Sequence, residues 1–596
     1  MRQWAVAIVV AIATVLGGVA TISAQENRMS LAEAIRGFEA ASHTTFRGAP
    51  DDWTTHHVIF SQPEAGSSAE ARVQQDPRYW LQRIRLLSSD ALSPDAEATA
   101  DAAAAKRKLR APRRIRRDWA VSMGSGATSG AGTFAAKFPL STVGSSNCGT
   151  DFVVYNTGLA GSKTQASIVA FNNLYKSPTC SGTVPGTYWA FNTGGTIVTS
   201  VVLSLEGTQI AFVQTTAGKA SLVVLKWAAG GTITAPGTPT QSASYPSCTA
   251  PCMITLPFNG SPNDTTSSPF WDPGGSDTAF VGDSVGKLHK FSPVFGGGTP
   301  AEITSGGFPV TVSQSMPAQA LASPVYDSGT GQVFVGDGHT AGGSNDGEVH
   351  AVLASNGTIS NSAATICHGI GYTDGPLLDP SAGELYFSCG NDHGGGAACP
   401  SGNACVRQFP ENFASGSAGT PESLGTGADA HIFPGAFDNI YQTSASASSP
   451  TGNLYVCGNP GGDPTLYRVP IASNAIGVPV TITALTTKGT NCAPVSEFFN
   501  STTSTDWLFL GVSASGNRTG CSGACVYSFN ATSALTAGTN ATSGLAAAAG
   551  PSGIIVDNIG AAASTVANIY LSTLGNQACT GGTGGCAEQA TQSGLM

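Results

Sequence analysis

Several signatures of common protein classes are missing from this sequence. Beyond its N-terminal apolar segment, no stretch of about twenty residues is free of turn-forming residues, so no further membrane-spanning helix is expected. The chain contains no C-x-x-C motif, which argues against a zinc ribbon, and no C-x-x-C-H motif, which argues against c-type haem attachment. Adjacent cysteines are also absent.

Charge is scarce as well, at 11% of all residues, and it is unevenly placed. Residues 25–118 contain 15 Lys+Arg and 13 Asp+Glu, whereas residues 119–596 contain 11 and 24. The larger part therefore has no basic face for nucleic acid, and no nucleic-acid partner is expected. The 75 glycines favour turn-rich β structure, and a 41% hydrophobic content arranged in short runs argues against disorder.

Residues 1–24 predict a secretory signal peptide. Arg2 supplies the positive start, Trp4 to Val19 the apolar core, and Ile22-Ser23-Ala24 a cleavage site. An uncleaved anchor helix is the alternative, but the apolar stretch is short for a span and polar sequence follows it. We therefore expect a secreted protein (extracellular, cell-surface or periplasmic) with no membrane span after cleavage.

The fourteen cysteines support export, because they are even in number and all lie beyond residue 140. The sequence leaves their connectivity open. Close neighbours can each close a local loop, and the remaining cysteines then form longer-range pairs. The candidates are Cys248/Cys252, Cys399/Cys405, Cys521/Cys525 and Cys579/Cys586, followed by Cys148/Cys180, Cys367/Cys389 and Cys457/Cys492.

Residues 25–118 predict a small helical region with a basic junction. Ser30 and Glu33 have the capping-box spacing at the start of "SLAEAIRGFEAA", and Trp80, Leu81 and Ile84 share one helical face. A further helix is expected from Ser93 to before Pro112. The basic run 106–117 has three interpretations: a solvated helix end, a protease-sensitive junction, or a contact with an acidic surface. The neighbouring His56-His57 is weak evidence for a metal.

From residue 119 to 596 the pattern changes to short apolar runs bounded by turn formers, which predicts strands. The runs repeat: "SPFWDPGGSDTAFVGDSVGKLHKF" (268–291) matches "SPVYDSGTGQVFVGDGHTAGGSNDGEVHAV" (323–352). We find eight such units, with central strands beginning near residues 152, 209, 279, 333, 385, 454, 507 and 568.

This rhythm resembles bacterial β-propellers of the quinoprotein-like or YVTN-like type. The resemblance implies an all-β fold, a seven- or eight-bladed β-propeller, with the blade number open because the first unit lacks a clear Ser-Pro strand. We expect residues 132–140 to supply the outer strand of the last blade and so close the ring. Quinoprotein dehydrogenases of similar fold use a disulfide between adjacent cysteines, so the resemblance does not extend to quinone chemistry.

One motif raises the question of catalysis. Residues 282–286 match G-x-S-x-G, but a nucleophile elbow needs a helix after the turn, and "KLHKF" reads as a strand. Sister repeats carry Gly or Asn in place of Ser284, so we interpret the motif as a hairpin. The recurring Asp272, Asp327 and Asp379 are interpreted as turn formers.

Other polar residues recur without singling out a site. Asp283 and Asp337 occupy equivalent turns, and His289 and His350 occupy equivalent strand positions, as repeat register requires. A paired-carboxylate glycosidase stays open, although nothing selects two of the acids.

Loop histidines give the best candidate site: His368, His393 and His431, with Asp392. The acidic, Gly-rich loops 337–348 and 389–396 have oxygen ligands of the kind that calcium takes, without EF-hand spacing. No other cofactor is evident.

We therefore expect a secreted, non-catalytic binding or structural module whose extracellular ligand, a glycan or a protein, is not identified by the sequence. The alternative is a propeller enzyme, a hydrolase or lyase acting on extracellular glycans. Charged or histidine side chains that converge at one channel mouth would indicate an enzyme, whereas a small and apolar lining would indicate a binding or structural module.

Overall fold

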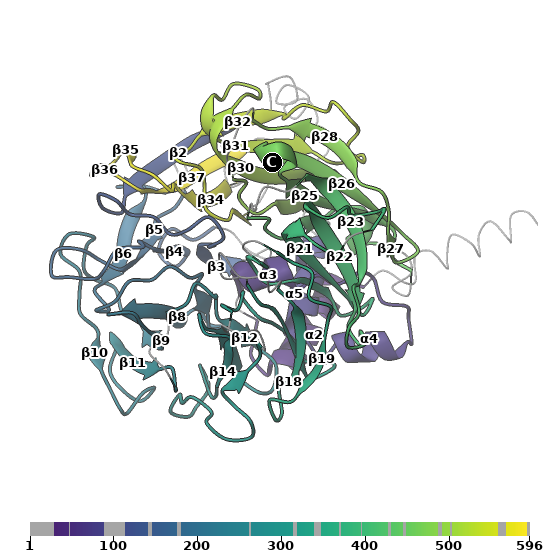
Figure 1. Ribbon diagram of the computed structural model, residues 1–596. Helices are drawn as coiled ribbons and strands as arrows, with labels where there is room; N and C mark the ends of the chain where they lie inside the picture. Colours follow the sequence, from purple (N-terminus) through teal and green to yellow (C-terminus); the bar gives the residue numbers. More distant parts are fainter. Residues whose placement is uncertain are drawn as a thin grey trace, which may run out of the picture.

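The computed structural model describes residues 29–46, 48–88, 114–140, 146–175, 180–260, 264–313, 319–338, 347–368, 371–394, 396–426, 431–444, 449–486, 491–500, 503–557 and 568–592. These residues form an eight-bladed β-propeller with helices in the middle of its ring (Figure 1). The predicted signal peptide and the helix expected from Ser93 lie outside the described residues.

Each blade is a sheet of about four strands that pair antiparallel, except that β10 (Thr240–Gln241) pairs parallel with its neighbour in blade 2, and consecutive blades follow the chain. Blade 1 contains β3 (Ala136–Leu140), β4 (Phe152–Asn156), β5 (Ile168–Asn172) and β6 (Gly186–Phe191); blade 2 contains β7 (Val202–Leu203), β8 (Gln209–Thr216), β9 (Lys219–Lys226), β11 (Cys252–Pro257) and β10 (Thr240–Gln241). Blade 3 contains β12 (Phe270–Asp272), β13 (Thr278–Gly282), β14 (Lys287–Phe291) and β15 (Val310–Thr311); blade 4 contains β16 (Val325–Asp327), β17 (Gln332–Gly336), β18 (Val349–Leu353) and β19 (Ile359–Ser362).

The second half of the ring follows the same plan. Blade 5 contains β20 (Leu377–Asp379), β21 (Glu384–Asp392), β22 (Asn403–Pro410) and β23 (Thr420–Thr426); blade 6 contains β24 (Ala436–Phe437), β25 (Gly452–Gly458), β26 (Thr465–Ala472), β27 (Ala475–Ile476) and β28 (Val480–Ala484), with the helices α7 (Asn439–Gln442) and η1 (Pro460–Gly462). Blade 7 contains β29 (Ser496–Asn500), β30 (Thr505–Gly516), β31 (Gly523–Asn530) and β32 (Ser543–Ala546); blade 8 contains β33 (Ile555–Asp557), β34 (Asn568–Ser572), β37 (Cys586–Gln592) and β2 (Ile115–Ser122). A separate hairpin joins β35 (Gln577–Cys579) and β36 (Gly582–Gly584).

The repeat pattern predicted these blades closely. The second strand of every blade begins within two residues of its expected position, from Phe152 in blade 1 to Asn568 in blade 8. These strands are buried on both faces, as in β13, where all five residues are buried. A strand covered on both sides reads as a short continuous apolar run rather than as an alternation. The blade number left open by the sequence is eight.

Hydrogen bonds between neighbouring blades support the inner ring. The Phe134 amide donates to Ser200 Oγ (3.0 Å), the Ser200 amide to Ser268 Oγ (3.0 Å), and the Ser268 amide to Ser323 Oγ (2.9 Å). Ser268 and Ser323 are the serines of the repeated Ser-Pro pairs. Each serine therefore satisfies a buried backbone donor at the start of the preceding blade.

The ring closes differently from the expectation. Strand β2 is the outermost strand of blade 8 and pairs antiparallel with β37. The prediction that residues 132–140 close the ring was wrong, because β3 is the innermost strand of blade 1. The propeller's strands thus begin at Ile115, inside the run interpreted as a basic junction. Pairing β2 with β37 covers the edge that the C-terminal strand would otherwise expose.

The N-terminal region contains α2 (Leu31–Ser42), α3 (Trp53–His57), α4 (Ser68–Val73) and α5 (Pro77–Ser88), with the short strand β1 (Ala49–Asp51) before α3. In Figure 1, α3 and α5 lie near the middle of the ring, and α4 lies further out. The predicted capping box is present at the start of α2, where Ser30 and Glu33 bond each other's backbone amides. The predicted second helix is α5.

Residues 49–60 cross the central channel, and we call them the crossing segment. β1 pairs with β3 of blade 1, and Val58 forms a bridge to Leu378 of blade 5, which lies opposite in a ring of eight. The Trp53 indole between them donates to the carbonyl of Pro269 at blade 3 (3.1 Å). Phe60, Tyr79 and other residues of the helical region belong to one buried cluster with residues of the blades. The helical region is therefore packed as part of the propeller.

Candidate functional site: a cavity in the central channel

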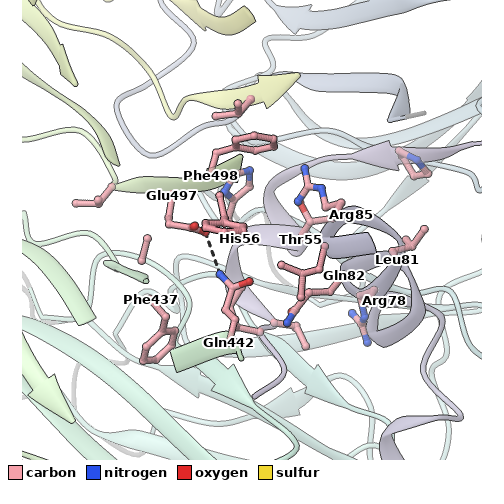
Figure 2. Close-up of a pocket in the computed structure, with 18 residues that line it drawn as sticks. Thr55, His56, Arg78, Leu81, Gln82, Arg85, Phe437, Gln442, Glu497 and Phe498 are labelled. Carbon is pink, nitrogen blue, oxygen red and sulfur yellow. Dashed lines mark hydrogen bonds between the residues drawn. The ribbon is translucent and has the colours of Figure 1, made fainter. Parts of the chain in front are cut away.

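A cavity of about 90 Å³ lies between the N-terminal helices and three blades. One wall comes from the crossing segment and α5, and the other from blades 6, 7 and 8 (Figure 2). Its lining residues are Pro50, Thr55, His56, Val58, Ile59, Arg78, Leu81, Gln82, Arg85, Leu86, Ala436, Phe437, Gln442, Val495, Glu497, Phe498, Phe499 and Val556. Because a water needs about 10–15 Å³ by this measure, the space suits a few waters or one small ring.

The two arginines in the wall are already ion-paired inside the helical region. Arg78 is 5% exposed and makes two hydrogen bonds to the carboxylate of Asp76, at 3.0 and 2.7 Å. Arg85 lies 2.9 Å from the carboxylate of Asp51, which is 1% exposed. Buried charges are stable only when they are paired in this way. The arginines therefore add no net charge to the cavity wall, and the Arg78 guanidinium lies over the Phe270 ring of blade 3, 4.7 Å from its centroid.

Glu497 on β29 is the only carboxylic acid among the described residues that line the cavity. Its Oε2 accepts a hydrogen bond from Gln442 Nε2 (2.9 Å), which Figure 2 shows as a dashed line. Burial raises the pKa of Glu497 well above its usual range, and the charge of Asp506 and a hydrogen bond with it raise it further. Burial also raises the pKa of Asp506, to about 6.

A proton shared by these two carboxyl groups explains their geometry. Glu497 Oε1 and Asp506 Oδ1 are buried and have no other hydrogen-bond partner among the described residues. Asp506 Oδ2 accepts from the Asn439 amide (3.0 Å), which favours the ionised form of this partner. At neutral pH, Glu497 is thus the protonated, uncharged member of the pair.

His56 faces the same cavity from the crossing segment. Its ring stacks on Phe134 with centroids 4.7 Å apart, and its Nε2 lies 3.8 Å from Asp51 Oδ1. Burial lowers the pKa of His56 to about 4. The negative charge of Asp51 raises this pKa, but its effect is smaller than that of burial, and Arg85 and His57 lower the pKa further. His56 is therefore neutral at physiological pH.

His57 points elsewhere, so the two adjacent histidines do not form a metal pair. Its Nδ1 lies 2.8 Å from the Trp53 carbonyl oxygen, and its Nε2 lies 3.7 Å from Asp374 of blade 5. Both histidines hold the crossing segment against the blades.

The structure brings two of the four residues of the predicted loop site together. The rings of His368 and His393 stack with centroids 4.0 Å apart. His431 lies instead against Phe433 and within 3.3 Å of Thr373 Oγ1. Asp392 is buried and forms two hydrogen bonds with Arg407, at 2.6 and 2.8 Å. A functional role for this loop site stays a prediction.

The calcium prediction rests on loops that the structure describes only in part. Residues 339–346 of the first loop and residue 395 of the second lie outside the described residues. Asp392 of the second loop is the partner of Arg407, and the nearby Cys399 and Cys405 are joined in a disulfide. The described residues of that loop therefore offer no set of free carboxylates, and calcium binding stays a prediction.

The recurring acids and bases form internal pairs at one position of successive blades. His289 lies between Asp283 (3.1 Å) and Glu302 (2.6 Å), and His350 lies 3.4 Å from Asp337. Arg407 occupies the corresponding position of blade 5, opposite Phe387, as His289 is opposite Val281. Burial alone would lower the pKa of His289, but its two carboxylate partners together raise it. These pairs tie a turn to a strand.

Ser284 lies in the turn between β13 and β14, and a strand follows it. Its amide donates to the carbonyl of Asp264 (3.0 Å), and Gly286 adopts a φ of +81°. The hairpin interpretation is confirmed. The turn role of the recurring aspartates is confirmed as well, since Asp272, Asp327 and Asp379 each accept from the amide two residues ahead.

The fourteen cysteines form seven disulfides. The pairs are Cys148–Cys180, Cys248–Cys252, Cys367–Cys389, Cys399–Cys405, Cys457–Cys492, Cys521–Cys525 and Cys579–Cys586, as the spacing suggested. So many disulfides fit an oxidising environment. Among the described residues, no helix combines the length and the apolar character needed to cross a membrane.

Sequence reasoning did not find the cavity. Its walls come from segments more than 400 residues apart, such as His56 and Glu497. The only local signal was the His56-His57 pair, whose two rings serve different contacts.

Comparisons with known proteins give structural likenesses but no sequence relative. No protein-family model matches the sequence, and no curated protein matches it. Among solved structures, BamB from Moraxella catarrhalis is 10% identical, with 80% of this chain and 97% of that chain covered and a TM-score of 0.38. The WD40 domain of Toxoplasma gondii coronin is 10% identical (72% and 83% covered, TM-score 0.36), and TolB from Acinetobacter baumannii is 11% identical (59% and 69%, TM-score 0.26). Because the identities and TM-scores are this low, nothing about the activity of this protein is inferred from these structures, and the propeller assignment rests on the eight sheets themselves.

Proposed function

We propose that the protein is an exported β-propeller that acts as a non-catalytic binding module outside the cytoplasm. The seven disulfides and the N-terminal signal pattern support export. The channel cavity is the best-formed candidate for the binding site, because it is concave, largely apolar and carries a few convergent polar groups.

One observation carries the non-catalytic assignment. Charged and histidine side chains do converge on the channel, which was the expectation for an enzyme. They are, however, neutralised by partners in the chain, and Glu497 is the only acid in the described cavity wall. Most glycoside hydrolases use two carboxyl groups that flank the bond. The cavity supplies one, and its proton is shared with Asp506.

A glycan hydrolase or lyase is the second candidate function. It is favoured by the protonated state of Glu497, since a carboxyl group with a raised pKa is what a general acid requires.

The test measures binding and turnover on the same preparation. The secreted protein is incubated with a panel of extracellular polysaccharides and oligosaccharides, and reducing ends and unsaturated products are measured beside calorimetric binding. We expect binding without turnover. Product formation that Glu497→Gln abolishes would establish the enzyme instead. Mass spectrometry of the mature N-terminus tests export, with Gln25 expected as the first residue.

A further inference from the structure

The charge balance of the cavity restricts what it can hold. Arg78 and Arg85 are each paired with an aspartate, His56 is neutral, and Glu497 is protonated. A ligand with a net charge would lose its hydration and find no unbalanced opposite charge in the wall, which is costly. The cavity therefore favours an uncharged ligand.

The wall nevertheless offers hydrogen bonds. His56 Nε2 is buried and has no hydrogen bond to any described residue. Leaving this nitrogen unsatisfied is unfavourable, and a ligand hydroxyl group can bond it whether the neutral ring offers a donor or an acceptor there. The Arg78 guanidinium is not counted, because it lies over the Phe270 ring of blade 3, 4.7 Å from the centroid.

The rest of the wall is apolar apart from Thr55, Gln82 and Gln442. Leu81 on α5, Phe437 on β24 and Phe498 on β29 line the cavity together with aliphatic side chains (Figure 2). A flat ring with C–H faces and hydroxyl groups at its edge matches this combination of aromatic and polar surface. A cavity of about 90 Å³ has room for one such ring and not for a chain of them.

We propose that the cavity binds a single uncharged, hydroxyl-bearing ring, a free monosaccharide or the end residue of a glycan, clamped between α5 and β29. This inference rests on the proposed function as a binding module and names its ligand class.

Five ring-matched probes, three neutral and two charged, test the ligand class. Binding of D-glucose and its neutral epimers D-galactose and D-mannose, of anionic D-glucuronate and of cationic D-glucosamine is measured by ligand-observed NMR at pH 7. We expect at least one neutral sugar to bind with a Kd on the order of 1 mM, as for a small ligand of ordinary efficiency. Both charged analogues should bind at least tenfold more weakly. Equal or tighter binding of a charged analogue, or no binding by any neutral sugar, overturns the proposal.

These outcomes separate the inference from the proposed function. If glucuronate alone binds, the ligand class is wrong and the binding role stands. If a glycan is cleaved, the proposed function fails although a neutral ring is bound.

Two variants test the location. Phe498→Ala removes an aromatic wall and should weaken sugar binding at least fivefold. Phe295→Ala is the matched control, because Phe295 is also partly buried but packs against Trp271 on blade 3, and it should leave binding unchanged. Circular dichroism confirms that each variant is folded. Equal affinities of the Phe498 variant and the wild type overturn the assignment.

A clamped ligand also predicts slower opening of the helical region. A ligand that binds only the docked state stabilises it by mass action, so sugar at 100 times its Kd should slow amide exchange in α5 by about a hundredfold, if exchange requires undocking. Trimethylamine N-oxide at the same concentration is the control for non-specific osmolyte effects, because it has neither a ring nor hydroxyl groups. Equal protection by trimethylamine N-oxide would contradict the clamp.

Discussion

Replacing Trp53 by alanine should release the N-terminal helices from the channel without unfolding the blades. Trp53 is 1% exposed, donates to the Pro269 carbonyl at 3.1 Å, and makes edge contacts with His57 and Phe270, with ring centroids 4.6 and 6.1 Å apart. Truncating a buried tryptophan to alanine typically costs about 3–5 kcal/mol. Most of this loss falls on docking, because the contacts join the crossing segment to blade 3.

Hydrogen exchange measures the effect directly. Since each 1.4 kcal/mol is a factor of ten, amides of α3 and α5 that exchange through undocking should lose roughly 10²- to 10⁴-fold of their protection. Amides of β13 and β17 should keep theirs. Unchanged exchange in α5 would refute the idea that Trp53 holds the helical region in place.

Trp227→Ala is the matched control for Trp53→Ala. Trp227 also uses its indole as a donor, to the Gly207 carbonyl (2.8 Å), but it packs with Tyr188 and Phe152 on the outer part of blades 1 and 2. Its truncation should loosen those blades and leave α5 protected. Loss of α5 protection in this variant as well would mean that the propeller opens as a whole.

Three further predictions concern the blades. A chain of residues 114–596 retains β2, whereas a chain of residues 123–596 lacks it and exposes the edge of β37. Gel filtration should therefore show much more aggregation of the shorter chain, and equal aggregation of the two chains would contradict closure by β2. The folded-state pKa of His289 is raised, so its stabilising effect is complete below about pH 6.5 and is lost as the pH rises through the folded-state value. Urea titrations from pH 5 to 9 should therefore show a steeper loss above pH 6.5 in the wild type than in His289→Gln, and parallel curves would exclude this linkage. Serine replacement of the Cys148–Cys180 pair, whose cysteines are 32 residues apart, should lower the free energy of unfolding by about 3.7 kcal/mol. The same replacement of Cys248–Cys252, with a separation of 4, should lower it by about 2 kcal/mol in thermal unfolding, and the reverse order would argue against loop entropy as the cause.

The blades could be predicted from the sequence because each repeats the same local physics. "FVGD" at 280–283 and at 334–337 marks a buried strand followed by a turn whose aspartate accepts backbone amides, and both copies adopt that structure. Most of the disulfides could be predicted from the sequence too, because four of the seven join cysteines only four to seven residues apart.

Ring closure was harder to predict because two segments have strand character before the first central strand, which begins at Phe152. Residues 136–140 and residues 115–122 both form strands, and the second carries Arg116 and Arg117, which suggested a solvated run. Arg117 in fact forms an ion pair with the buried Glu588 on β37, with Nε 3.0 Å from Oε1. Burial raises the pKa of Glu588, and the charge of Arg117 offsets part of that increase. Only the position of β37 shows that this basic strand has an acidic partner.

The candidate site could not be predicted for a related reason. The helical region occurs once, so no sister copy marks which of its residues face the channel. Its acids and bases balance within the region itself, as in Asp51 with Arg85 and Asp76 with Arg78, and so leave no unusual charge in the sequence.

This pairing of charges in the cavity wall has a consequence for ligand recognition. A wall whose charges are already paired discriminates against charged ligands and selects through the polar groups that remain. His56 is such a group and comes from the helical region, whereas the aromatic rings of Phe437 and Phe498 come from the blades. Binding and docking of the helices are then a single equilibrium, and any change that undocks the helices removes half of the site.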